Sequence, residues 1–257
     1  MLNFRNTNIV FSILLVALTG YDIVFGHPFY YYIILLIIYS LLLFWGSYDV
    51  GSNFYFQTIC SAKTNNKQIA ISFDDGPLPQ FTPQVLQILK EHQVPAAFFC
   101  IGKRAQEHAE LLKQIIAEGH LVGNHSYSHH RWFDLFSADK MFEDLRQMDA
   151  AMKHITGLKP RLFRPPYGVT NPNLKKAVIR GGYIAVGWNI RSLDTVIKTE
   201  QKLLRKVTRL LKPGAVILFH DTMKVTPGIL SAFIRQVKDN GYEIVRLDKL
   251  LNLDPYA

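Results

Sequence analysis

Two adjacent aspartates, Asp74 and Asp75, lie in the hexapeptide SFDDGP, between an apolar run and a Gly-Pro pair. Neighbouring carboxylates repel each other unless a positive group lies beside them. Aspartate, glycine and proline are also ordinary turn residues, so the hexapeptide taken alone fits a solvated turn better than a functional site. The chemistry of the pair therefore depends on which other polar side chains the fold brings to it.

A pair of histidines, His125 and His129 in NHSYSHH, offers such a partner. Their spacing of four residues puts both imidazoles on one side if the segment turns helically. Two histidines and one carboxylate form a metal site that stays open to water and substrate. A divalent cation there would relieve the repulsion between the two aspartates, with one of them binding the ion and the other lying beside the metal-bound water.

Short apolar runs alternate with helical patterns after residue 66. The predicted strands are 68–73, 95–101, 120–124, 161–163, 183–190, 215–220 and 242–247. The predicted helices are 82–92, 103–118, 138–156, 173–180, 199–211 and 227–240, with Ser137 as an N-cap and Gly157 as a C-cap. This alternation indicates an α/β domain with a mostly parallel sheet, either doubly wound or closed into a barrel. Chemistry is expected where the strands end.

Five polar clusters follow the ends of predicted strands. Besides the aspartate and histidine pairs they contain Arg164 in RPPYG, Asp194 in WNIRSLD and His220 in ILFHD. Because the carboxyl ends of parallel strands meet at one edge, all five are predicted to converge on one rim.

The N-terminal segment is apolar enough for a membrane. Residues 29–45 are uncharged and form a helix of roughly 26 Å, close to the hydrocarbon thickness of a bilayer. Residues 9–25 contain Gly20 and Asp22 and fit either a spanning helix or a signal peptide. We favour a helix, and hence a helical hairpin that meets the lipid bilayer through residues 9–46. The expected organisation is a membrane segment over residues 1–48, a linker over 49–66 and a soluble domain over 67–257.

The positive charge of the chain lies in the soluble domain. The formal net charge is +9, and residues 1–50 contribute only Arg5, Asp22 and Asp49. A basic domain favours an anionic partner such as an acidic glycan or a lipid surface. No run of basic residues longer than two occurs, which argues against nucleic acid. The two cysteines, Cys60 and Cys100, match no zinc or disulfide pattern.

The sequence resembles the NodB-type polysaccharide deacetylases, carbohydrate esterase family 4. The resemblance rests on five segments that match the five motifs of that family in the same order: SFDDGP, HSYSH, RPPY, RSLD and ILFH. The resemblance covers roughly residues 67–250. It implies a distorted (β/α)7 barrel, here preceded by the N-terminal transmembrane hairpin. It also implies a metal-dependent hydrolase that removes acetyl groups from N-acetylated amino sugars of a peptidoglycan-like or chitin-like polysaccharide.

The resemblance assigns roles to individual residues. It makes Asp74 the general base, with Arg164 as its ion-pair partner. The metal, most often Zn²⁺, is expected to bind three side chains: Asp75, His125 and His129.

The remaining roles concern the acid and the substrate. His220 is expected to act as the general acid, tuned by Asp194, and the backbone N–H of Tyr167 to bind the oxyanion. The expected substrate contacts are Leu218, which faces the acetyl methyl group, and Pro166 and Trp188.

One motif departs from the family pattern. The fourth commonly reads Asp-x-x-Asp-Trp, whereas residues 191–195 read RSLDT. The tuning aspartate is present, but the tryptophan that would wall the substrate groove is missing. Arg191 fits either a surface charge without function or a contact to an anionic substrate.

Two alternatives to a polysaccharide deacetylase remain open. One is a deacylase of a lipid-linked amino sugar, and the other is an inactive, glycan-binding member of the fold. The expected location is a membrane, for which a bacterial cytoplasmic membrane fits best, with the catalytic domain on its outer side.

Overall fold

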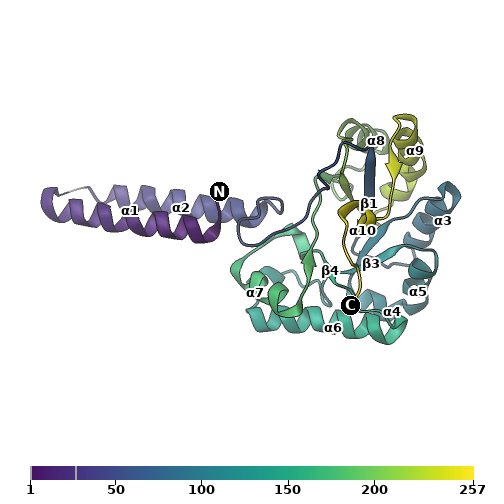
Figure 1. The fold of residues 1–257 in the computed structure, drawn as a ribbon, viewed down its shortest axis with the longest axis horizontal. Coiled ribbons are helices and arrows are strands. Elements are labelled where there is room, and N and C mark those ends of the chain that lie inside the picture. Colours follow the sequence, from purple (N-terminus) through teal and green to yellow (C-terminus); the bar gives the residue numbers. More distant parts are fainter. Residues whose placement is uncertain (1, 27) are drawn as a thin grey trace.

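Two long apolar helices precede an α/β domain in the computed structural model, which describes residues 2–26 and 28–257 (Figure 1). Helix α1 (Phe4–Phe25) and helix α2 (Tyr30–Tyr48) are long and apolar enough to cross a membrane. Residues 1 and 27 of the predicted membrane segment lie outside the described part.

The two helices pack side by side in opposite directions. The Tyr39 hydroxyl donates to Asn8 Oδ1 at 2.9 Å, and the Tyr32 hydroxyl donates to Asp22 Oδ2 at 3.2 Å. Large apolar side chains such as Val16 are exposed on the outside of the pair. An exposed apolar surface of this kind is typical of a membrane or protein contact, and it is compatible with the expected hairpin.

The domain is built on one parallel sheet. Its strands are β1 (Gln68–Asp74), β2 (Ala97–Cys100), β3 (Leu121–Asn124), β4 (Leu162–Phe163), β5 (Ile184–Ala185), β6 (Ile190–Arg191), β7 (Val216–His220) and β8 (Glu243–Ile244). Seven of them follow the order β5-β4-β3-β2-β1-β7-β6, and β8 pairs with the start of β1. The parallel sheet predicted from the sequence is therefore confirmed, in the form of a half-barrel.

Most helices of the domain lie around the outside of this sheet (Figure 1), whereas the last one packs against its inner face through Leu247 and Leu250. The helices are α3 (Thr82–His92), α4 (Gly102–Glu107), α5 (Ala109–Ala117), α6 (Ala138–Thr156), α7 (Pro172–Gly181), α8 (Glu200–Arg209), α9 (Val225–Asp239) and α10 (Leu247–Leu251). The single helix predicted for residues 103–118 is wrong, because the chain breaks at His108 into α4 and α5.

The strand predicted for residues 183–190 is also wrong, since it is two strands, β5 and β6. The N–H of Ile59 donates to the carbonyl of Ala185, and the N–H of Gly187 donates to the carbonyl of Ile59. Further along, Ser61 bridges to Ala215 just before β7. Residues 49–66, for which we expected a linker, thus contribute backbone to the gap between the two ends of the sheet.

The end of helix α2 is fastened to the domain. The N–H and the hydroxyl of Thr170 donate to the carbonyls of Ser47 and Gly46, at 3.0 Å and 3.1 Å. Thr170 is buried, and the side chain of Phe54 fills the space beside Gly46, where a Cβ would lie 2.3 Å from the ring. The helix pair and the domain therefore share a packed, hydrogen-bonded junction.

Candidate active site

The five polar clusters predicted to converge do so at the carboxyl ends of the strands. They surround a cavity of about 240 Å³, lined by Asp74, Asp75, His125, His129, Tyr167, Gly168, Trp188, Arg191, Thr195, Leu218 and His220. The register of the central strands explains part of this arrangement, because Asp74 of β1 pairs with His220 of β7. Arg164 and Asp194 do not line the cavity, but both are buried and contact the lining residues Asp74 and His220.

Asp75, His125 and His129 form a set of ligands for a metal ion. Their ligand atoms all lie within 4.8 Å of one another. Oδ1 of Asp75 lies 3.5 Å from Nε2 of His125 and 3.4 Å from Nε2 of His129. Nδ1 of His125 lies 2.9 Å from the carbonyl of Arg164, to which it can only donate, so the lone pair of Nε2 is free. Two imidazole nitrogens and one carboxylate oxygen, all three facing the cavity, fit a divalent cation.

The protonation of these ligands favours cation binding. Burial raises the pKa of Asp75, but its contacts with the imidazoles of His125 and His129 leave it well below its usual value. Burial, reinforced by His125, lowers the pKa of His129 to about 4. A carboxylate and a neutral imidazole are the forms that bind metals, so neither needs to lose a proton at neutral pH.

The two histidines meet by a different route from the helical turn considered above. Residues 125–129 are not helical, and both Ser126 (φ 64°) and His129 (φ 43°) have left-handed backbone. The backbone N–H groups of Tyr127 and Ser128 donate to Asp144 Oδ1, at 2.8 Å and 3.2 Å. Asp144 belongs to helix α6, so these hydrogen bonds fix the loop, which lacks the backbone hydrogen bonds of a helix. The spacing of residues in the sequence did not indicate this role of Asp144.

Arg164 forms a wholly buried ion pair with Asp74. Its Nη1 donates to Asp74 Oδ1 at 2.7 Å and to Ser72 Oγ at 2.9 Å. Its Nε and Nη2 donate to the carbonyls of residues 186 and 187, and its guanidinium lies 4.0 Å from the ring centre of Phe99. With these donors satisfied, the buried charge is compensated in the way that such a pair requires.

Asp221 supports the turn that follows the aspartates, a role that the sequence did not reveal. It accepts a hydrogen bond from the Thr82 hydroxyl at 2.6 Å, and burial raises its pKa to about 7. A Cβ at Gly76 would lie 2.1 Å from its Oδ2, so only glycine fits there. The position of Asp221 directly after His220, in ILFHD, was the only feature of the sequence that could have indicated that Asp221 lies near the site.

His220 is oriented by Asp194. Its Nδ1 lies 2.7 Å from Asp194 Oδ1, and its backbone N–H donates to Oδ2. The hydroxyl of Thr226 also donates to Oδ2, at 2.8 Å. Burial lowers the pKa of His220, but the hydrogen bond and charge of Asp194 outweigh it and raise the pKa to about 9. This shift favours the imidazolium, the form that can donate a proton.

The predicted substrate contacts divide into two groups. Leu218 and Trp188 line the cavity, whereas Pro166 is buried and is not among the lining residues. Tyr167 has left-handed backbone (φ 59°), and its ring packs edge-on against His129 at 4.7 Å between centres.

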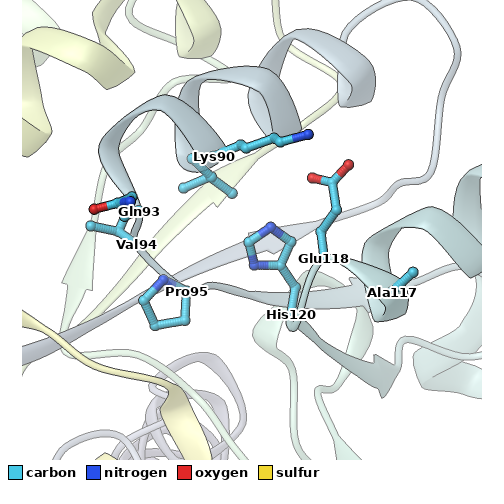
Figure 2. Close-up of a pocket in the computed structure, with 8 residues that line it drawn as sticks. Lys90, Gln93, Val94, Pro95, Ala117, Glu118 and His120 are labelled. Carbon is cyan, nitrogen blue, oxygen red and sulfur yellow. The ribbon is translucent and has the colours of Figure 1, made fainter.

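A second cavity, of about 520 Å³, lies at the opposite end of the sheet (Figure 2). His120 and Glu118 face it from the turn before β3, and Lys90 faces it from helix α3. Nδ1 of His120 accepts a hydrogen bond from the N–H of Ala96, so in neutral imidazole Nε2 carries the proton and is no metal ligand. Although this cavity is larger, the reactive groups lie in the other one.

Comparison with known proteins supports the same reading. The sequence profile of the Polysaccharide deacetylase family matches residues 61–186. A peptidoglycan-N-acetylglucosamine deacetylase of Listeria monocytogenes is 34% identical over 74% of this chain, which spans only 40% of that relative. One of Bacillus cereus is 34% identical, covering 73% of this chain and 89% of the relative. The crystal structure of the Bc1960 peptidoglycan N-acetylglucosamine deacetylase superposes with a TM-score of 0.74 at 28% identity, covering 78% of this chain and 95% of that one.

The chain therefore belongs to the polysaccharide deacetylase family, carbohydrate esterase family 4, and is close to its peptidoglycan N-deacetylases. The resemblance noted in the sequence is confirmed.

The ligand set predicts which substitutions release a metal. Asp75→Ala, His125→Ala and His129→Ala should each abolish tight binding, because a site of this kind needs three protein ligands. Asp74→Asn should retain the metal, since Asp74 pairs with Arg164. Metal content after dialysis against a weak chelator measures both. Near-stoichiometric metal in any of the three alanine variants would contradict the ligand set.

The contact between Asp194 and His220 predicts a pKa change. Asp194→Asn should lower the pKa of His220 from about 9 toward the ordinary value of 6.5, because the negative charge that stabilises the imidazolium is lost. NMR titration of the His220 ring protons in the metal-free protein measures this, with Lys202→Gln as a surface control. An unchanged pKa in Asp194→Asn would show that the field of the remaining aspartates governs His220.

Proposed function

We propose that the protein is a metal-dependent N-deacetylase of an N-acetylated glycan, of the peptidoglycan or chitin type. The observation that carries this proposal is the position of a carboxylate, Asp74, and a tuned histidine, His220, on two paired strands beside one metal triad. A base and an acid on either side of an electrophilic centre are what amide hydrolysis needs.

We further propose that the native ion is Zn²⁺, bound by Asp75, His125 and His129. When bound, the ion would supply Lewis acidity that polarises the acetamide carbonyl and lowers the pKa of water to about 7. The ligand set of two imidazoles and one carboxylate supports zinc over magnesium or calcium, which prefer oxygen ligands.

The side chains of this protein carry the proton transfers. Asp74 takes the proton of the attacking water, and Arg164 fixes the position of its carboxylate. The backbone N–H of Tyr167 donates to the oxygen that gains charge. His220 then protonates the departing amine, with Asp194 stabilising its charged form until that step. Leu218 and Trp188 form the apolar wall against which the acetyl group lies.

The helix pair is proposed to cross a membrane and to hold the catalytic domain on its outer side. The hairpin is flanked by three basic residues, Arg5, Lys63 and Lys67. Basic residues near a membrane helix favour the cytoplasmic side, so this charge distribution gives weak support to a cytoplasmic domain. The nature of the substrate weighs more heavily, because peptidoglycan and chitin lie outside the membrane. An extracytoplasmic domain is therefore the stronger inference.

A second candidate substrate is a lipid-linked amino sugar, and the junction at Thr170 favours it. Tyr167 and Thr170 are three residues apart, so their Cα atoms are separated by at most about 11 Å. Thr170 contacts the last turn of α2, whose Trp45 and Tyr48 fit the aromatic belt of a bilayer. The cavity would then open close to the lipid surface.

Release of acetate tests the function. The detergent-solubilised protein with Zn²⁺ should release acetate from peptidoglycan or chitooligosaccharides, and Asp74→Asn should be slower by at least about 100-fold. A lipid-linked N-acetylhexosamine forms the third arm. Acetate from the lipid-linked sugar alone would establish the second candidate, and none from any of the three would overturn the proposed reaction.

Reporter fusions after residue 257 test the topology. A C-terminal alkaline phosphatase should be active, because that enzyme matures only outside the cytoplasm, and a fluorescent protein that folds only in the cytoplasm should be dark. The opposite pattern would place the domain inside the cell, where only a precursor or an inner-leaflet lipid-linked sugar is available.

A further inference from the structure

Arg191 occupies a position in the cavity that the proposed chemistry does not use. It ends strand β6 and pairs in register with Leu218 of β7. Side chains at paired positions of neighbouring strands lie on the same face of a sheet, about 5 Å apart. The side chain of Arg191 therefore starts one strand away from the proposed acetyl pocket, and Arg191 lines the same cavity.

The charge of Arg191 is not neutralised within the protein. Arg191 is exposed, and none of the ion pairs within 4.0 Å among the described residues includes it. Its guanidinium lies 5.8 Å from the ring centre of Trp188, which limits the directions in which it can point. The other strong charges of the cavity have partners, since Asp74 pairs with Arg164 and Asp75 faces the two histidines.

Further cations gather behind this position. Lys206 Nζ donates to the carbonyl of Arg191 at 2.7 Å, and Lys198 Nζ donates to the carbonyl of Thr195, another lining residue, at 2.7 Å. Burial and the charges of Arg209 and Arg191 together lower the pKa of Lys206, which shows that these cations lie within each other's field. One side of the cavity thus carries a positive potential that attracts anions.

We propose that Arg191 selects substrates with an anionic group, a carboxylate or a phosphate, on the reacting amino sugar or on the sugar next to it. This inference rests on the proposed deacetylase function and narrows its substrate class. A guanidinium that lies beside an indole ring, here 5.8 Å from its centre, presents a fork of N–H donors that matches either anion. The group must lie within one sugar because Arg191 begins beside the acetyl pocket.

The test compares matched neutral and anionic oligosaccharides. The full-length protein with Zn²⁺ is offered an N-acetylglucosamine tetramer, a tetramer in which alternate sugars carry a lactyl carboxylate, and a phosphorylated tetramer. Arg191→Gln removes the charge, Arg191→Lys keeps the charge without the fork, and Lys202→Gln removes an exposed charge from helix α8 that does not line the cavity.

The expected result is a change of preference. Arg191→Gln should lower the ratio of kcat/KM for the anionic over the neutral substrate by about 10-fold or more, the value of one charge-assisted hydrogen bond. Arg191→Lys should recover part of that ratio, and Lys202→Gln should leave it within about 2-fold. The anionic substrate that loses more identifies carboxylate or phosphate as the recognised group.

Other outcomes separate this inference from the function on which it rests. If Arg191→Gln lowers kcat/KM equally on neutral and anionic substrates, Arg191 only packs on Trp188 and the selectivity proposal fails while the deacetylase function stands. If the wild-type protein prefers the neutral substrate, the selectivity proposal also fails. If no substrate yields acetate with the wild-type protein, the proposed function itself is overturned.

Discussion

The buried ion pair between Arg164 and Asp74 is the interaction on which the site depends. A guanidinium with no exposure to solvent is costly unless each of its donors is satisfied. Here the partners come from β1, from the carboxyl end of β5 and from the aromatic ring of Phe99 on β2, so these elements must take one arrangement to satisfy it. The pair therefore fixes the carboxylate of Asp74, the proposed base, and also joins the middle of the sheet to its open edge. Losing either partner would leave an uncompensated charge in the core.

Much of the strained backbone of the domain lies in the loops that line this site. Asp75, Ser126, His129, Tyr167 and Leu193 all have positive φ, each at a cost of about 1–3 kcal/mol for a residue other than glycine. Such conformations persist only where neighbours hold them, and around the histidines backbone N–H groups donate hydrogen bonds to Asp144 Oδ1 and Asn124 Oδ1. The folded domain thus compensates for the unfavourable backbone conformations. These conformations place the metal-ligating side chains where a regular helix or strand would not place them.

The sequence predicted most of the polar side chains that meet in the cavity and most of the alternation of strands and helices, because both follow from local patterns. Polar clusters after apolar runs identified Asp74, Asp75, His125, His129, Arg164, Asp194 and His220, which the structure brings together. Long-range partners were not accessible in this way. Asp144 and Asp221 act through contacts with residues on other elements, and the break between β5 and β6 coincides with the pairing of Ile59 to the backbone at residues 185–187. Left-handed backbone at Tyr167 carries no signal in residue type, since tyrosine rarely adopts it.

The junction between α2 and the domain determines how the proposed anchor and the cavity are related. If residues 49–66 formed a flexible linker, the distance between the domain and its anchor would vary, with a root-mean-square value of roughly 25 Å. Instead, this segment pairs with the edges of the sheet, and Thr170 bonds to the last turn of α2 within three residues of Tyr167. With the proposed membrane crossing, the cavity would be held at a fixed distance from the lipid surface and in a fixed orientation. Such a restraint raises the effective concentration of membrane-attached glycans at the cavity. It also keeps the cavity away from polysaccharide that lies far from the membrane. The same restraint would keep the basic side of the cavity, around Arg191, close to any charged group that lies near the membrane.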